Sequence, residues 1–281
     1  MSANEKISKE ALKEKVLEKL PTLPKVVQEA WKLMERPNVS PELISEVIGK
    51  DITLTAKILR LINSPFYGFP NRIGSLKHAI ILLGFNTIRG LLISSVLFGE
   101  ITPPLMRIWE HACECATTAG IIARQLNYKE ADEITVAGLL HDMSKVVLKV
   151  YLPEIDAKIE IVKQKSLCLD YEAEKEVMGF AHDVINLWLA EQWHFPPSLT
   201  EALAYHHTVE KAKKYPQFAA IINLADVLIH VYRLTPGMEV IPEIHPKTYE
   251  ILNIFPDFLL EIIRTMDRTL YNLEWGIDER K

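Results

Sequence analysis

The chain has 281 residues, of which 48% are hydrophobic and 25% charged, and its formal net charge is −5. This length allows one large domain or two small ones, and the composition is ordinary for a globular protein with a sizeable core. The negative balance gives no electrostatic case for direct binding to nucleic acid or to an anionic membrane surface. Three cysteines, an odd number in a chain this long, do not indicate a disulfide framework.

The N-terminal sequence and the apolar runs favour a cytoplasmic protein without membrane insertion. Met1 to Lys15 is polar and charged, so we expect no signal peptide with a basic and then an apolar region. The longest apolar runs, at 79–85 and 90–98, are shorter than the ~20 residues that a helix needs to cross a bilayer.

Apolar residues recur at helical spacing through most of the chain, and alternating β-branched runs are nearly absent, which predicts an all-α fold. Ser40 followed by Pro41 predicts a helix start, because serine can accept free backbone N–H groups and proline needs no donor there. Residues 63–70 interrupt the pattern with two prolines, a glycine and three aromatics, which predict an ordered loop. Helices are expected in this part over residues 10–20, 25–36, 41 onward, 53–62, 75–83 and about 87–98.

Paired prolines at 103–104 mark the clearest internal boundary, since proline ends one helix and can begin the next. Ser198 and Glu201 form a capping box, so the helix that carries His206 has a defined start. Later helices are expected over residues 107–126, 133–151, 170–193, 198–207, 216–233 and 247–271. The expected organisation is an N-terminal helical subdomain over 1–102, a second helical subdomain over 103–235 and a C-terminal helical extension over 236–281.

Histidines and aspartates on separate predicted helices carry the candidate chemistry. His141 and Asp142 are adjacent at the end of an apolar run, and a buried imidazole beside a buried carboxylate is costly unless both are hydrogen-bonded or metal-bound. Other predicted helices present further candidates from inward or near-inward faces, namely His111, His182, His206, His207 and Asp226. By contrast, His78, His230 and His245 show no carboxylate or second histidine at a metal-binding spacing in this interpretation.

Imidazole and carboxylate are the ligand types of Zn, Fe and Mn, so a divalent metal centre is one interpretation of these residues. Two ions would need a carboxylate between them, and Asp142 is placed for that role; paired ions also lower the pKa of a shared water. A buried polar network without metal is the alternative. Lys145 could contact a substrate phosphate or could lie on a solvated helix face.

Four segments together resemble the HDOD family, the HD-related output domains of bacterial signalling proteins. They are Leu20 to Pro24, Leu61 to Tyr67, Ile80 to Gly84 and Gly138 to Asp142, and the resemblance covers about residues 18–235. It implies an all-α fold in which an N-terminal helical subdomain packs on a divergent HD-like bundle. It also implies a role in bacterial signal transduction, usually without demonstrated catalysis.

A more distant resemblance to HD-GYP proteins, metal-dependent phosphodiesterases that act on cyclic di-GMP, implies a ligand set. One ion would take His111, His141, Asp142 and Asp226. A second ion would share Asp142 and take His182, His206 and, as an option, His207. Two departures matter: Ser144 replaces the usual glycine, and no Gly-Tyr-Pro signature follows His207, so the element associated with cyclic dinucleotide hydrolysis is missing.

We therefore expect an HDOD-type regulatory output protein rather than an enzyme. It would bind a divalent Fe, Mn or Zn centre, either single or binuclear. It would act through signalling proteins or a small ligand such as a cyclic dinucleotide or another nucleotide, with Phe66 and Tyr67 as partner contacts. One alternative is an active metal-dependent phosphohydrolase, in which Asp142 and Lys145 would be catalytic. A metal-free helical adaptor with a degenerate HD site is the second alternative.

Overall fold

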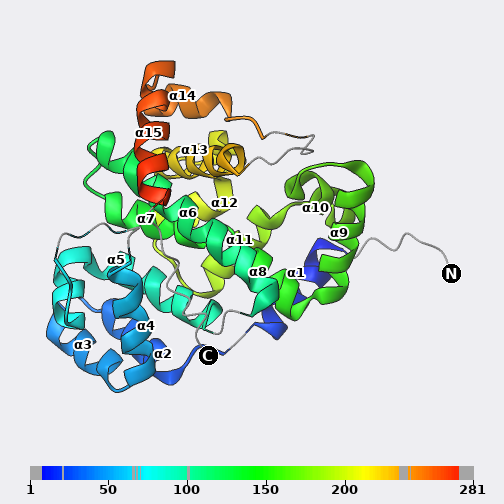
Figure 1. Cartoon of the computed structure of the whole chain (residues 1–281). Coiled ribbons are helices and arrows are strands. Elements are labelled where there is room, and N and C mark those ends of the chain that lie inside the picture. The colour runs from blue at the N-terminus through cyan, green and yellow to red at the C-terminus, as the bar shows by residue number, and fades with distance from the viewer. Residues whose placement is uncertain are drawn as a thin grey trace.

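A computed structural model describes residues 8–20, 22–64, 67, 69, 71–99, 102–233, 240 and 242–271. Every regular element within these ranges is helical, which confirms the predicted all-α fold (Figure 1). The helices form two groups that meet where the C-terminal half of α5 (Leu76–Leu97) packs against α7 (Ala131–Leu140).

The first group contains α2 (Lys25–Met34), α3 (Pro41–Gly49), α4 (Ile52–Ile62) and α5, and lies at one end of the molecule (Figure 1). The Ser40 side chain accepts a hydrogen bond from the Leu43 N–H at 3.2 Å, so this helix start forms as predicted. Helix α5 bends at Gly84, where φ is +76°, a backbone conformation that favours glycine. The sequence predicts the end of one helix and the start of another at the same place.

Helix α5 joins the two short apolar runs, and among the described residues it is long and apolar enough by composition to cross a membrane. However, 61% of its most apolar window is buried inside the fold. Its packing on α3, α4 and α7 is that of a core helix.

The second group surrounds α13 (Pro216–Tyr232) and α6 (Pro103–Gln125). Helix α1 (Lys9–Lys19) packs on this group rather than on the first, against α8 and α11 (Figure 1). The remaining members are α7, α8 (Met143–Tyr151), α9 (Pro153–Ser166), α10 (Asp170–Met178), α11 (His182–Gln192), α12 (Pro197–Tyr205) and the short 3₁₀ turn η1 (Val209–Lys211).

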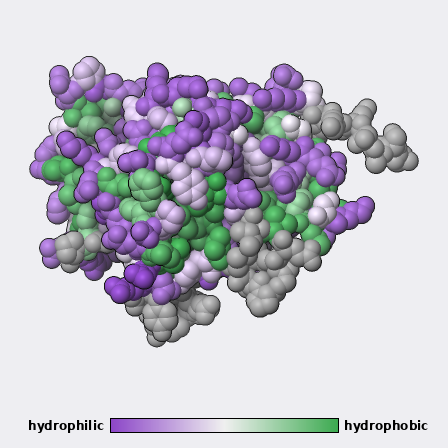
Figure 2. All heavy atoms as spheres, turned by 90° about the horizontal axis from the view of Figure 1, so that it is seen from above, coloured by the Kyte–Doolittle hydropathy of each residue, from purple (hydrophilic) through white to green (hydrophobic). Residues whose placement is uncertain are grey.

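The C-terminal extension covers the second group. Helix α14 (Pro246–Leu252) packs on α13, and α15 (Pro256–Tyr271) packs on α6. Figure 2 shows the face on this side of the molecule, where hydrophilic residues surround an apolar area. The exposed apolar side chains of α14, α15 and the turn between them include Tyr249, Phe255, Leu260 and Ile263.

Three long helices of the sequence-based prediction are wrong, because each is broken. The helix expected over 133–151 breaks at 141–142. The helix expected over 170–193 breaks after Gly179, whose φ is +83°, and the one expected over 247–271 breaks at Asn253, whose φ is +51°. Helix α9 is not among the predicted helices, although Pro153 stands at its start.

Candidate metal centre

The break between α7 and α8 positions the His141–Asp142 pair, and the fully buried Asn186 of α11 holds that break. Its side-chain oxygen accepts the Ser144 N–H at 3.1 Å, and its side-chain nitrogen donates to the carbonyls of His141 and Leu203. The Ser144 hydroxyl donates to the carbonyl of His182 at 3.0 Å. The serine that replaces the expected glycine therefore ties the α7–α8 junction to the start of α11.

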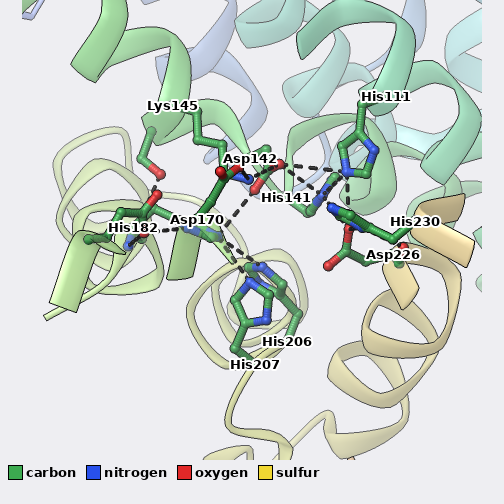
Figure 3. Close-up of polar contacts among 12 residues, drawn as sticks. His111, His141, Asp142, Lys145, Asp170, His182, His206, His207, Asp226 and His230 are labelled. Atoms are coloured by element: carbon green, nitrogen blue, oxygen red, sulfur yellow. Dashed lines mark hydrogen bonds and ion pairs between the residues drawn. The ribbon is translucent and has the colours of Figure 1, made fainter. Parts of the chain in front are cut away.

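All seven side chains that the sequence suggests as metal ligands converge on one region (Figure 3). Helix α6 supplies His111, the α7–α8 junction supplies His141 and Asp142, and α11 supplies His182. His206 and His207 follow α12, and Asp226 lies on α13. Most of these residues are buried, with 0–5% of their surface exposed; His111 and His207 are partly buried.

One cluster surrounds the Oδ2 atom of Asp142. His111 Nε2 lies 3.0 Å from Asp226 Oδ1, 3.2 Å from His141 Nε2 and 3.7 Å from Asp142 Oδ2. His141 Nε2 lies 3.4 Å from Asp142 Oδ2 and 3.7 Å from Asp226 Oδ1. Ligands about 2.0–2.1 Å from a tetrahedral ion are separated from one another by about 3.3–3.4 Å, so these spacings fit one ion.

A second cluster surrounds the other oxygen of the same carboxylate. His182 Nε2 lies 3.2 Å from Asp142 Oδ1, 3.3 Å from His206 Nε2 and 3.2 Å from His207 Nε2. Figure 3 shows Asp142 between the two groups, with His111 and Asp226 on one side and His182 with His206 and His207 on the other. Asp142 is therefore placed to bridge two ions.

Hydrogen bonds at Nδ1 fix how three of the imidazoles face these clusters. Nδ1 of His141 lies 2.8 Å from the Gly138 carbonyl, and Nδ1 of His206 lies 3.1 Å from the Leu203 carbonyl. Nδ1 of His182 lies 2.7 Å from Glu174 Oε2. A proton on Nδ1 leaves a lone pair on Nε2, which is the tautomer that binds metal through Nε2.

The contact between His182 and His206 shows how well a cation fits. In these tautomers two Nε2 lone pairs face each other at 3.3 Å, which is repulsive unless a proton or a metal ion lies between them. The donor set, nitrogen and carboxylate oxygen, matches Zn, Fe and Mn. The residues present therefore fit a divalent transition metal.

The pKa shifts show where positive charge is favoured. Burial disfavours a charged His182, but Glu174 and Asp142 outweigh burial and raise its pKa to about 10. Burial likewise opposes a charged His141, yet Asp142 and Cys115 hold its pKa well above the usual value. At His206, burial and the neighbouring His182 and His141 lower the pKa to about 3, so this imidazole stays neutral with a free lone pair.

Lys145 lies inside the site rather than on a solvated helix face. Its Nζ is 2.9 Å from Asp142 Oδ2 and 3.2 Å from Asp170 Oδ2. Burial disfavours its charge, but these two carboxylates outweigh burial and raise the pKa of the ammonium group. Lys145 is thus a charged group beside the proposed bridging carboxylate.

Two residues that the sequence analysis left out belong to the site. His230 lies one helical turn after Asp226, with Nδ1 3.0 Å from Asp226 Oδ1, and it groups with His111 and Asp226 as a potential ligand set. The i,i+4 spacing of Asp226 and His230 is visible in the sequence, so the statement that His230 lacks a carboxylate at a metal-binding spacing is wrong. Glu174, the Nδ1 partner of His182, gives no comparable sequence signal because a helix break separates the two.

Of the two expected partner contacts, Phe66 and Tyr67, the structure describes Tyr67. The Tyr67 side chain is only 2% exposed, and its ring stacks on Phe69 with centroids 5.6 Å apart. Phe66 lies outside the described residues. Tyr67 is therefore packed within the fold, away from the surface that a partner could contact.

A cavity of about 280 Å³ opens onto the centre. His182, His207, Asp226, His230 and Lys145 line the side that faces the clusters. Residues 242–246 line the cavity as well, although they lie well after the last predicted ligand in sequence. A ligand in this cavity would lie directly against the proposed metal ligands.

A helical bundle with an adjacent His–Asp pair and further histidines on neighbouring helices defines an HD-like protein with a candidate two-metal centre. Residues 20–209 match the sequence model of the HDOD domain, and the chain belongs to the HDOD family. A curated protein of Treponema pallidum (strain Nichols), itself uncharacterized, is 23% identical over 90% of the chain, which spans about half (49%) of that protein's length.

Solved structures show the same fold. An HDOD domain protein of unknown function from Geobacter sulfurreducens is 24% identical, with a TM-score of 0.65 over 94% of this chain and 90% of that one. A candidate phosphohydrolase from Shewanella amazonensis SB2B is 22% identical, with a TM-score of 0.67 over 90% and 93% of the two chains. A candidate signal transduction protein from Marinobacter aquaeolei VT8 is 21% identical, with a TM-score of 0.68 over 92% and 58%.

Proposed function

We propose that this chain is a regulatory output protein of bacterial signal transduction that holds two divalent ions and binds a phosphate-containing ligand on them. The observation that carries the proposal is the position of Asp142. Its Oδ2 faces His111 and His141 while its Oδ1 lies 3.2 Å from His182 Nε2. A buried carboxylate that directs each oxygen to a different group of imidazoles matches a bridging ligand.

The residues divide between the two ions as follows. His111, His141, Asp142 and Asp226 would hold one ion, with His230 within reach of the same group. Asp142, His182, His206 and His207 would hold the other. Glu174 and the carbonyls of Gly138 and Leu203 orient the imidazoles through Nδ1.

Charge balance favours an anionic ligand at this centre. Two divalent ions would bring four positive charges, and the carboxylates of Asp142, Asp226 and Glu174 would cancel three of them. Lys145 is balanced by Asp170 at 3.2 Å, and His206 and His207 stay neutral because burial lowers their pKa values. The surplus of about one positive charge next to the cavity favours an anionic ligand such as a phosphate group.

The proposed signalling role rests on membership of the HDOD family and on the shared fold. The Marinobacter aquaeolei protein, which has this fold, is a candidate signal transduction protein. We propose that ligand binding at the centre changes how the chain contacts a signalling protein.

Elemental analysis of protein purified without a histidine tag tests the metal proposal. We expect nearly two equivalents of Fe, Mn or Zn per chain, and little metal in a His141→Ala/Asp142→Ala variant. His78→Ala is the matched control, because His78 is exposed and lies in the first helical group. Absence of metal in the parent protein, even after reconstitution with each ion, would refute the proposal and leave a helical adaptor.

Hydrolysis of a phosphoester is the second candidate function, and the cavity is the observation that favours it. The cavity would place a phosphoester against residues of both clusters, and divalent ions held there would supply Lewis-acid activation of water and of a phosphoryl oxygen. Lys145 would hold positive charge beside the phosphoryl group. Turnover of a phosphoester that is lost in Asp142→Ala would establish this activity.

A further inference from the structure

The wall of the cavity formed by residues 242–246, hereafter the strap, lies beyond the matched HDOD segment, which ends at residue 209. The strap leads into the start of α14, so the cavity next to the centre is lined in part by a segment of the chain that contributes no proposed ligand. Pro242, Ile244 and Pro246 supply apolar surface to the cavity.

Three contacts of His245 hold the strap over the cavity. Its N–H donates to Asn223 Oδ1 at 3.0 Å, and its Nδ1 accepts the Lys247 N–H at 3.2 Å. Its Nε2 lies 3.0 Å from Glu210 Oε2, which fits the tautomer with the proton on Nε2. The imidazole of His245 is therefore held through both of its ring nitrogens.

Asn223 links the strap to the centre. It is 3% exposed, it also accepts the Thr248 hydroxyl at 2.8 Å, and it lies on α13 one turn before Asp226. One helix thus holds both the strap and a proposed metal ligand, so the strap has a fixed position relative to the ions.

We propose that the strap limits the ligand of this centre to a phosphomonoester of mononucleotide size or smaller and excludes cyclic dinucleotides. This inference rests on the proposed function, since it assumes that the centre binds a phosphate group on metal. Ligand pockets in proteins usually measure ~300–1,000 Å³. The cavity of about 280 Å³ lies just below this range, whereas a cyclic dinucleotide contains two nucleotides and needs about twice the space of one.

Charge at the strap supports a ligand with a single phosphate group. The exposed Glu243 adds negative charge at the cavity wall, which disfavours a second phosphate group there.

Isothermal titration calorimetry on the metal-loaded full chain tests the proposal with orthophosphate, GMP and cyclic di-GMP as probes. In the parent protein we expect orthophosphate and GMP to bind and cyclic di-GMP to bind at least about tenfold more weakly than GMP. In His245→Ala, which loses the ring and two of the three strap contacts, we expect the affinity for cyclic di-GMP to rise at least about tenfold. Orthophosphate affinity should stay within about twofold, because the ions and their ligands are unchanged.

Two further variants keep the result interpretable. Glu210→Gln weakens the His245 contact from outside the cavity lining and should raise the affinity for cyclic di-GMP in the same direction. Lys247→Ala is the control, because it retains its backbone N–H and its side chain pairs with Glu250. Metal content and circular dichroism identify any variant that fails to fold.

The outcomes separate the two proposals. Cyclic di-GMP binding to the parent protein within about twofold of GMP, or unchanged selectivity in both strap variants, would overturn the inference while leaving the metal centre intact. A metal-loaded protein that binds none of the three probes would instead refute the proposed phosphate site itself, and this inference with it.

Discussion

Whether an imidazole of this centre can bind a metal ion depends on which of its ring nitrogens carries the proton. Glu174 contacts both the N–H and Nδ1 of His182 at 2.7 Å, so it fixes the backbone and the ring of the same residue. With the Nδ1 proton held there, Nε2 points toward Asp142, His206 and His207. A single buried carboxylate thereby selects the metal-binding tautomer.

This arrangement predicts a pH dependence for the metal-free protein. The pKa of His182 is raised to about 10 in the fold, above its unfolded value of about 6.5. The folded state therefore binds more protons between these values, so this contribution to stability is fully present below about pH 6.5 and is lost as pH rises toward about 10. Chemical denaturation of chelator-treated protein between pH 6.5 and 10 measures the loss.

Glu174→Gln is the informative variant for this effect, because it removes a negative charge that outweighs burial and raises the pKa of His182. We expect its stability to fall less over the same pH range than that of the parent protein. Glu176→Gln, at an exposed position on the same helix, should behave like the parent. Identical pH slopes in all three proteins would show that Glu174 does not set the protonation of His182.

At the scale of helices, the close approach of α6 and α7 sets the spacing of His111 and His141. A Cβ added at Gly138 would lie 2.8 Å from the Ala116 Cα and 3.1 Å from the Cys115 carbonyl oxygen, which are backbone atoms of α6. Gly138 therefore lets the two backbones meet, and His141 follows one turn later. The distance of 3.2 Å between the two Nε2 atoms depends on this contact.

Gly138→Ala should therefore cost about 1–3 kcal/mol of folding stability, as overpacking usually does, and should also weaken metal binding. Gly49→Ala is the control: nothing lies within 4 Å of its added Cβ, so it should be neutral or stabilising. Thermal unfolding and metal titration of both variants provide the measurement. Equal stability of the two would contradict the close-contact interpretation.

The sequence predicts the helices well where local signals are strong, and it predicts the breaks between helices less well. Ser40 and Pro41 mark a helix start that forms, and Gly84 marks a real bend. The break at His141–Asp142 depends on Asn186, which lies far away in sequence, and no local pattern indicates it. Periodicity continues across that break, so the sequence predicts one helix where two form.

The residues of the candidate centre can likewise be predicted from sequence where they leave a local pattern, and only there. Apolar faces identify His111, His182 and Asp226, and the i,i+4 spacing of Asp226 and His230 is a further local signal. Glu174 and the strap could not be found in this way, because both reach the centre through tertiary packing alone. Residues that orient ligands or enclose a cavity leave little local trace in a single sequence.

At the scale of the whole molecule, the proposed ligands join five parts of the second helical group, from α6 to α13. Two ions bound there would cross-link helices that otherwise meet through apolar packing. Because the unfolded chain lacks this arrangement, metal binding must stabilise the fold, by about 2.7 kcal/mol for each ion at a free concentration of 100 times its dissociation constant.

We therefore expect metal loading to raise the thermal midpoint by about 5 °C or more, since 1 kcal/mol corresponds to ~2–4 °C in domains of comparable size. The chelated parent protein should unfold at the lower midpoint and regain the shift when metal is added back, whereas the His141→Ala/Asp142→Ala variant should show the same midpoint with and without added metal. His78→Ala should keep the full metal-dependent shift. A shift that survives the loss of His141 and Asp142 would place the stabilising ion elsewhere in the chain and remove the structural basis for a two-ion centre.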